Sequence, residues 1–81
     1  YWLGESYYVT RDFPRSMTEF KKLVSTYPQS PKLPGAQLKI GFIHQAMGET
    51  TQAKAVLEQL VARYPSSTAA RLARDRLKRL K

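Results

Sequence analysis

The sequence contains no cysteine and a single histidine, His44. Without cysteine the chain can form neither a disulfide nor a zinc site built on thiolates, and it has no thiol nucleophile. One histidine leaves metal clusters and histidine-assisted nucleophiles with one residue at most, so we expect His44 to pack between helices. No apolar run approaches the ~20 residues of a membrane-spanning helix. These absences exclude most metal and covalent chemistry.

Glycine and acidic residues are also scarce. The four glycines, at positions 4, 35, 41 and 48, form neither a dinucleotide-binding fingerprint nor a phosphate-binding loop. The six acidic residues are spread along the chain, and no two are placed to share a substrate. The sequence therefore predicts no catalytic residue, no metal site and no cofactor, and we expect that the protein is not an enzyme.

The residues that are present predict one small folded domain over 1–81. Hydrophobic residues make up 42% of the chain and charged residues 25%, which is too apolar a balance for disorder. A chain this short buries only about 60% of its unfolded surface, so its core is expected to be small. The first four residues do not match the basic start of a secretion signal, and we expect a mature or trimmed piece.

An internal repeat organises the sequence. Residues of the first half return 37 positions later as residues of similar size or character. The first set is Gly4, Tyr7, Ser16, Phe20, Leu23, Val24, Tyr27 and Pro28, and the second is Gly41, His44, Ala53, Leu57, Leu60, Val61, Tyr64 and Pro65. Such a period indicates a small unit that stacks on its copy, because one unit cannot bury its apolar face alone. We expect repeat 1 at about 1–30 and repeat 2 at about 35–66.

Each repeat is predicted to contain two helices. Apolar residues at steps of three and four predict a helix over 51–64, which ends before Pro65 because proline cannot continue it. The same pattern predicts a helix over 14–27, with partner helices over 1–11 and 35–47. Because the turns between partners are short, the two helices of each pair are expected to be antiparallel.

Capping residues predict where several helices begin, and small residues predict where paired helices approach closely. Asp12 and Thr50 are the expected N-caps of the second helices. A fifth helix is expected over 67–80, where a run of three hydroxyl residues can cap it. Gly4 and Gly41 lie inside the first helices. They are expected to face Ser16 and Ala53, so that paired helices approach closely.

The fifth helix is predicted to have an apolar side and a strongly basic side. Its apolar side consists of Ala69, Leu72, Ala73, Leu77 and Leu80. Six of the fourteen basic residues fall in the last eleven positions, which hold one acidic residue, Asp75. The last helix of a repeat stack needs a polar outer face, so we interpret this helix as a cap. The alternative is a nucleic-acid-binding surface built on Arg71, Arg74, Arg76 and Arg79, consistent with the net charge of +8.

The order of these residues resembles the tetratricopeptide repeat. Leu3, Gly4, Tyr7, Ser16, Phe20 and Pro28 follow its pattern, and Ile40, Gly41, His44, Ala53, Leu57 and Pro65 follow it again. Two features depart from it, since the period is longer than the usual ~34 residues and His44 replaces a tyrosine. The resemblance implies an all-α tetratricopeptide-repeat solenoid of two antiparallel helical hairpins plus a C-terminal capping helix.

Several short segments of the sequence are also similar to one particular family. Tyr1-Trp2-Leu3-Gly4-Glu5, Tyr27-Pro28, Leu38-Lys39-Ile40-Gly41 and Arg63-Tyr64-Pro65 resemble the C-terminal domain of the periplasmic TolA-binding proteins, the cell division coordinators of the Tol-Pal system. This implies binding to TolA in the periplasm, an indirect link to the peptidoglycan synthesis machinery, and homo-oligomers through an upstream coiled coil. The alternative is a tetratricopeptide-repeat scaffold of an outer-membrane assembly lipoprotein, since that family shares part of this sequence pattern.

The expected partner-binding surface lies on the first helix of each repeat. Tetratricopeptide repeats line their concave groove with these helices, and here the positions hold large apolar residues with a few polar ones. The candidate residues are Tyr1, Glu5, Tyr8, Leu38, Lys39, Phe42 and Gln45. Aromatic anchors with a few polar groups suit the capture of a peptide or helix from another protein. We do not expect nucleic acid to be the main partner.

Overall fold

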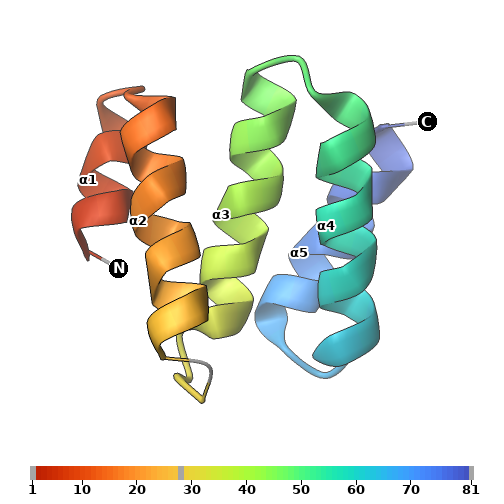
Figure 1. Cartoon of the computed structure of the whole chain (residues 1–81). Coiled ribbons are helices and arrows are strands. Elements are labelled where there is room, and N and C mark those ends of the chain that lie inside the picture. Colours follow the sequence, from red (N-terminus) through yellow and green to blue (C-terminus); the bar gives the residue numbers. More distant parts are fainter. Residues whose placement is uncertain (1, 28, 81) are drawn as a thin grey trace.

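The computed structural model describes residues 2–27 and 29–80, with Trp2 and Glu5 described by their backbone alone. Within these ranges the chain is all-α, as predicted, and it contains five helices and no strand. They are α1 (Trp2–Val9), α2 (Phe13–Thr26), α3 (Leu33–Ala46), α4 (Thr50–Arg63) and α5 (Thr68–Arg79) (Figure 1). None of these helices has the length and apolar character that crossing a membrane requires.

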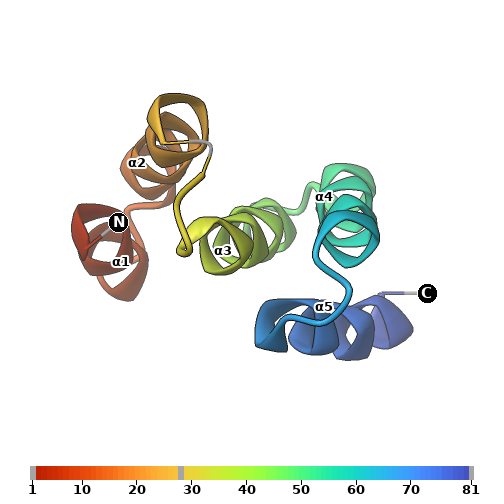
Figure 2. The ribbon, with the colours of Figure 1, turned by 90° about the horizontal axis from the view of Figure 1, so that it is seen from below.

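The helices form two layers. Figure 2 shows α1, α3 and α5 on one side of the molecule and α2 and α4 on the other. α1 packs against α2 and α3 packs against α4, so each repeat is a helical hairpin. α3 also contacts α2 and α5, which makes it the central helix of the stack. The termini therefore lie at opposite ends of a row of helices.

Prolines and one serine set several helix boundaries, and those at Pro65 and at the hydroxyl run before α5 are the predicted ones. Pro14 and Pro34 lie in the first turns of α2 and α3, where a missing N–H costs nothing. α4 ends at Arg63, just before the Tyr64-Pro65 pair. The Ser67 hydroxyl caps α5 by accepting a hydrogen bond from the Ala70 N–H at 3.0 Å.

The predicted caps of α2 and α4 need correction. Asp12 is the N-cap of α2, but its side chain accepts no hydrogen bond from the first turn. Thr50 is the first residue of α4, and Glu49 takes the N-cap position, also without a side-chain cap bond. The Asp12 carboxylate instead lies 3.5 Å from Arg15 Nε. These helices are held by packing against their partners, which does not depend on a side-chain cap.

The turns within the two hairpins have the same backbone. Asp12 N–H donates to the Tyr7 carbonyl at 2.8 Å, and Glu49 N–H donates to the His44 carbonyl at 2.8 Å, 37 residues later. Each bond closes the end of the first helix in a Schellman arrangement. The residue before each donor has a left-handed conformation, with a φ of 64° at Arg11 and 79° at Gly48.

Each hairpin has a tight seam at its glycine, as predicted. The Ser16 hydroxyl donates to the Gly4 carbonyl at 2.8 Å, yet the group that covers Gly4 is the Phe20 ring, 3.1 Å from where a Cβ would lie. In the second hairpin, Leu57 Cδ2 lies 2.6 Å from the Cβ position of Gly41. The large residues at equivalent positions, rather than the small ones, therefore use the space that each glycine leaves.

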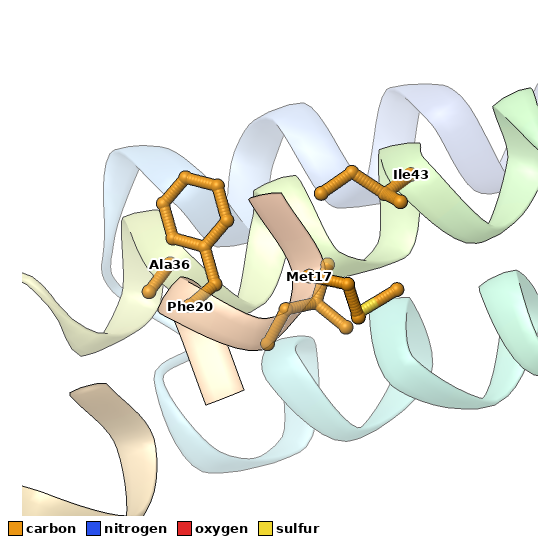
Figure 3. Packing of buried hydrophobic residues seen from close by; sticks show 5 residues of the cluster. Met17, Phe20, Ala36 and Ile43 are labelled. Atoms are coloured by element: carbon orange, nitrogen blue, oxygen red, sulfur yellow. The ribbon is translucent and has the colours of Figure 1, made fainter. Parts of the chain in front are cut away.

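Most of the buried apolar residues of the described chain fall into two clusters. The first joins α2 and α3 and contains Met17, Phe20, Ala36, Ile40 and Ile43 (Figure 3). The second joins α3, α4 and α5 and contains Leu38, Leu57, Leu60, Ala69 and Ala73. Leu72 was expected on the apolar side of α5, but it is 42% exposed, and Ala70 is buried there instead. α5 therefore covers the second hairpin mainly with small side chains.

Candidate protein-binding surface

Three helices face the same side of the stack. We call the side formed by α1, α3 and α5 the inner surface. Among the described side chains, the predicted site residues Tyr8, Lys39, Phe42 and Gln45 are partly buried and contribute to it. They fall into two groups, one between α1 and α3 and one between α3 and α5.

The first group joins α1 to α3. The Lys39 Nζ lies 4.4 Å from the centroid of the Tyr8 ring, a distance at which the cation is attracted to the ring face. The Tyr8 ring also contacts the edge of Phe13, with centroids 5.9 Å apart. Tyr8 packs beside the first core cluster and is only partly buried. Its ring is therefore fixed in place while part of it stays accessible.

The second group joins α3 to α5. The guanidinium carbon of Arg76 lies 4.2 Å from the centroid of the Phe42 ring. Its Nη1 also donates a hydrogen bond to Gln45 Oε1 at 2.5 Å. The planar guanidinium thus stacks on an aromatic ring and bonds an amide at the same time, which suits arginine better than lysine. Phe42 and Gln45 are both held by the capping helix.

Sequence reasoning missed Arg76 as a member of this surface. Its signal was the period itself, because Arg76 stands 37 residues after Lys39. At both positions a cation reaches back to an aromatic ring on the preceding inner helix. Arg76 is in fact partly buried, unlike its basic neighbours Arg74 and Lys78.

The expectation that Leu38 lines an open groove is wrong. Leu38 is 6% exposed and belongs to the second core cluster. Its side chain packs with Leu57 and Leu60 of α4 and with Ala69 and Ala73 of α5. The capping helix covers this position of α3, so Leu38 stabilises the stack and offers no surface to a partner.

Two predicted site residues are not placed by the structure. Tyr1 lies outside the described residues, and of Glu5 only the backbone is described. The backbone places Glu5 in α1, three residues before Tyr8. Their assignment to the inner surface stays a prediction.

A shallow depression lies beside Tyr8. It has a volume of about 270 Å³ and is lined by Tyr8, Val9, Arg11, Phe13 and Ala46. Val9 is 77% exposed, and the exposed Ala46 is its equivalent one period later. Sequence reasoning did not select these two residues, although the spacing of 37 relates them. The depression extends the accessible part of the inner surface to the ends of α1 and α3.

His44 lies at the turn between α3 and α4 and contacts Glu49 on the other side of that turn. Its Nδ1 lies 2.8 Å from Glu49 Oε1, and its side chain is 15% exposed. The pair spans the turn between α3 and α4 and adds to the backbone bond between the same two residues. Within residues 2–27 and 29–80, no group of three or more potential metal ligands comes together.

Stacked helical hairpins with an accessible inner surface define a helical-repeat protein. A family model described as tetratricopeptide repeat matches residues 1–30 and 35–67. The chain therefore belongs to the tetratricopeptide repeat family, whose repeats are protein–protein interaction modules and are typically not catalytic. No curated protein matches the chain.

Proposed function

We propose that the protein is a non-enzymatic interaction module whose inner surface holds a segment of another protein. The observation that carries this proposal is the pair of partly accessible aromatic rings, Tyr8 and Phe42, each stacked with a cation from the next inner helix. Aromatic residues and arginine dominate the binding energy of protein interfaces. The three helices that carry these side chains, α1, α3 and α5, lie on one side of the molecule (Figure 2).

The rigidity of these side chains favours binding. Tyr8 is held by Phe13 and Lys39, and Phe42 is held by Arg76. A partner that contacts rings already fixed in place loses less conformational entropy on binding than one that must order flexible side chains. The inner surface is therefore suited to holding an extended or helical segment laid across α1 and α3.

We further propose that the partner is TolA and that binding takes place in the periplasm during cell division. The support is the likeness of the chain to the periplasmic TolA-binding proteins at Tyr1-Trp2-Leu3-Gly4-Glu5, Leu38-Lys39-Ile40-Gly41 and the two Tyr-Pro turns. In that role the protein would bring TolA close to the peptidoglycan synthesis machinery and so help coordinate wall synthesis with constriction of the outer membrane.

A titration with purified TolA tests both statements. The double variant Tyr8→Ala/Phe42→Ala removes the two rings, and we expect its affinity for TolA to fall at least about tenfold. The matched control is Tyr27→Ala, which removes a tyrosine that is 61% exposed outside the inner surface. We expect the control to bind like the parent protein. Absence of any TolA binding by the parent would overturn the choice of partner.

A second variant separates binding from folding, since Tyr8 and Phe42 also pack beside the core clusters. Val9→Asp/Ala46→Asp places two charges at exposed positions beside the depression and leaves the core untouched. We expect this variant to keep the parent's helical content, with a slightly lower melting temperature because aspartate is unfavourable at a helix C-terminus, while it binds TolA more weakly. If both double variants fold and bind TolA with the parent's affinity, the inner surface is not the binding site.

A further inference from the structure

The side of α5 opposite its buried alanines carries a line of exposed basic residues, and none of them belongs to the two groups of the inner surface described above. Arg71, Arg74 and Lys78 are exposed and follow one another at steps of three and four along the helix. We call these three residues the basic stripe. We propose that the basic stripe is a second interaction surface, which binds an acidic segment of a partner protein.

The stripe is presented by a helix that is fixed on its opposite side. Ala69 and Ala73 of α5 are buried against α4, and Leu77 packs beside them. At a rise of about 1.5 Å per residue, Arg71 and Lys78 are separated by about 10 Å along the helix axis. A firmly docked helix therefore displays three positive charges in a fixed row.

One arginine of the stripe is already positioned. Arg74 Nη2 donates a hydrogen bond to the Pro65 carbonyl at 2.8 Å, which holds its guanidinium over the turn between α4 and α5. Arg71 and Arg74 line a depression of about 310 Å³ together with residues 65–68. The remaining N–H groups of Arg74 can bond a carboxylate that also reaches Arg71. Holding one side chain in advance lowers the entropy lost on binding.

The stripe has little acidic compensation in its own helix. Asp75 is the single acidic residue of α5, and it is exposed. In the described part of the chain, no ion pair within 4.0 Å joins Asp75 to a residue of the stripe. The local charge stays positive, so an acidic partner is the complementary one.

Two observations favour an acidic protein segment over other anions. α5 has no aromatic residue on which the bases of a single-stranded nucleic acid could stack. The apolar side of α5 lies in the second core cluster, so it is not available to enter a lipid surface. A row of about 10 Å suits acidic side chains spaced three and four residues apart on a helix, which lie on one face.

The test uses a defined probe, an alanine-based helical peptide with three glutamates at positions i, i+3 and i+7. In about 50 mM salt, where exposed charges are only partly screened, we expect the parent protein to bind it. The variant Arg71→Gln/Arg74→Gln/Lys78→Gln is expected to bind about tenfold more weakly. The matched control Arg15→Gln/Lys21→Gln/Lys22→Gln removes three exposed charges from α2 and is expected to change the affinity less than about twofold.

Charge reversal separates pairing from general attraction. The variant Arg71→Glu/Arg74→Glu/Lys78→Glu is expected to lose the glutamate peptide and to bind the same peptide with lysines in place of glutamates. Equal losses in the glutamine variant and its α2 control would overturn the proposal. So would tighter binding of a 20-nucleotide dT strand than of the peptide, with that binding lost in the stripe variant, since the stripe would then be a nucleic-acid surface. Tyr8→Ala, which alters the inner surface without touching α5, is expected to bind the peptide like the parent, so this outcome is independent of the inner surface.

Discussion

Arg11 and Gly48 occupy the same backbone position in the two hairpin turns, and the two residue types differ in the conformational strain that this position causes. Both stand 37 residues apart at the end of a first helix, and both have a left-handed conformation. Glycine adopts this conformation without strain, whereas a residue with a Cβ loses about 1–2 kcal/mol. The side chain of Arg11 lines the depression beside Tyr8. The first turn therefore carries a local strain that the second turn lacks.

We predict that Arg11→Gly raises the free energy of unfolding by about 0.5–1 kcal/mol. The substitution relieves the strained φ of 64°, and part of the gain is lost because glycine increases the freedom of the unfolded chain. Urea denaturation followed by circular dichroism measures the change, with the slope of the transition expected to stay constant.

The reciprocal variant Gly48→Ala is the control for this prediction. It introduces a Cβ at a φ of 79°, where no atom of the described residues, its chain neighbours apart, lies within 4 Å of the new group, so its effect reports the backbone alone. We expect it to lower the free energy of unfolding by about 1 kcal/mol. Equal stability of Arg11→Gly and the parent would mean that the first turn is not strained.

Local chemistry of single residues could be predicted from the sequence, and long-range pairing could not. Pro14 and Pro65 act through their own backbone geometry, and Ser67 bonds an N–H three residues away. The stacking of Arg76 on Phe42 joins residues 34 positions apart and depends on where α5 docks. A pattern of charge along one helix does not show which of its basic residues turns inward.

At the scale of the helices, the two hairpins use one packing device. Each first helix has a glycine, and each second helix places a large side chain over it, Phe20 over Gly4 and Leu57 over Gly41. The second contact is the tighter one, because Leu57 is fully buried and lies within 3 Å of the missing Cβ. The seam between α3 and α4 therefore depends on a specific pair of residues.

A double-mutant cycle on Gly41 and Leu57 tests this seam. We predict that Gly41→Ala lowers the free energy of unfolding by about 1–2 kcal/mol, because the new methyl group overpacks against Leu57. In a Leu57→Ala background the clash is gone, and the same substitution is expected to raise stability by about 0.5–1 kcal/mol through its better helix propensity. Chemical denaturation of the four proteins gives the coupling energy.

The sign of the effect decides the interpretation. An additive result, with Gly41→Ala equally destabilising in both backgrounds, would show that the glycine serves the backbone of α3 rather than the contact with α4. Leu57→Val is a milder background in case Leu57→Ala proves too unstable to measure. It removes Cδ2, the closest atom, and keeps a γ-carbon near the 2.9 Å contact, so the expected relief of the clash is partial.

Helix positions were predictable because the apolar spacing and the prolines act within a few residues. The helix expected over 51–64 is α4 (Thr50–Arg63), and the one expected over 35–47 is α3 (Leu33–Ala46). α1 ends at Val9, earlier than the expected 11, because the Schellman turn closes there. Turn geometry of this kind leaves no clear mark in the sequence when an arginine occupies the left-handed position.

At the scale of the whole molecule, the helices pack around two core clusters, and α3 contributes residues to both. The buried residues of the first come from α2 and α3, and those of the second come from α3, α4 and α5. The burial of Leu38 depends on this arrangement of whole helices. Its helical position is the one predicted, but whether the position is open or covered depends on how α5 packs against α3. Sequence spacing gives the face of a helix and does not give its neighbour.

Because no buried residue belongs to both clusters, we predict that the C-terminal part of the stack can be loosened without the N-terminal part. Ala73 is fully buried between α4 and α5. Ala73→Glu places a charge there that has to leave the core, so α5 is expected to undock. Amide hydrogen exchange is expected to become at least about tenfold faster in α5 and to increase in α4, while α2 stays near its parent rate.

The neighbouring substitution Leu72→Glu is the matched control, since Leu72 is 42% exposed on the same helix. It adds the same charge and leaves the docked side of α5 intact, so its exchange pattern is expected to equal that of the parent. In a repeat protein, stability is approximately a sum of units and their nearest-neighbour interfaces, and an interface lost at one end should be felt mainly next to it. If Ala73→Glu instead speeds exchange equally from α1 to α5, the five helices unfold as one unit, and the two clusters are not energetically separate.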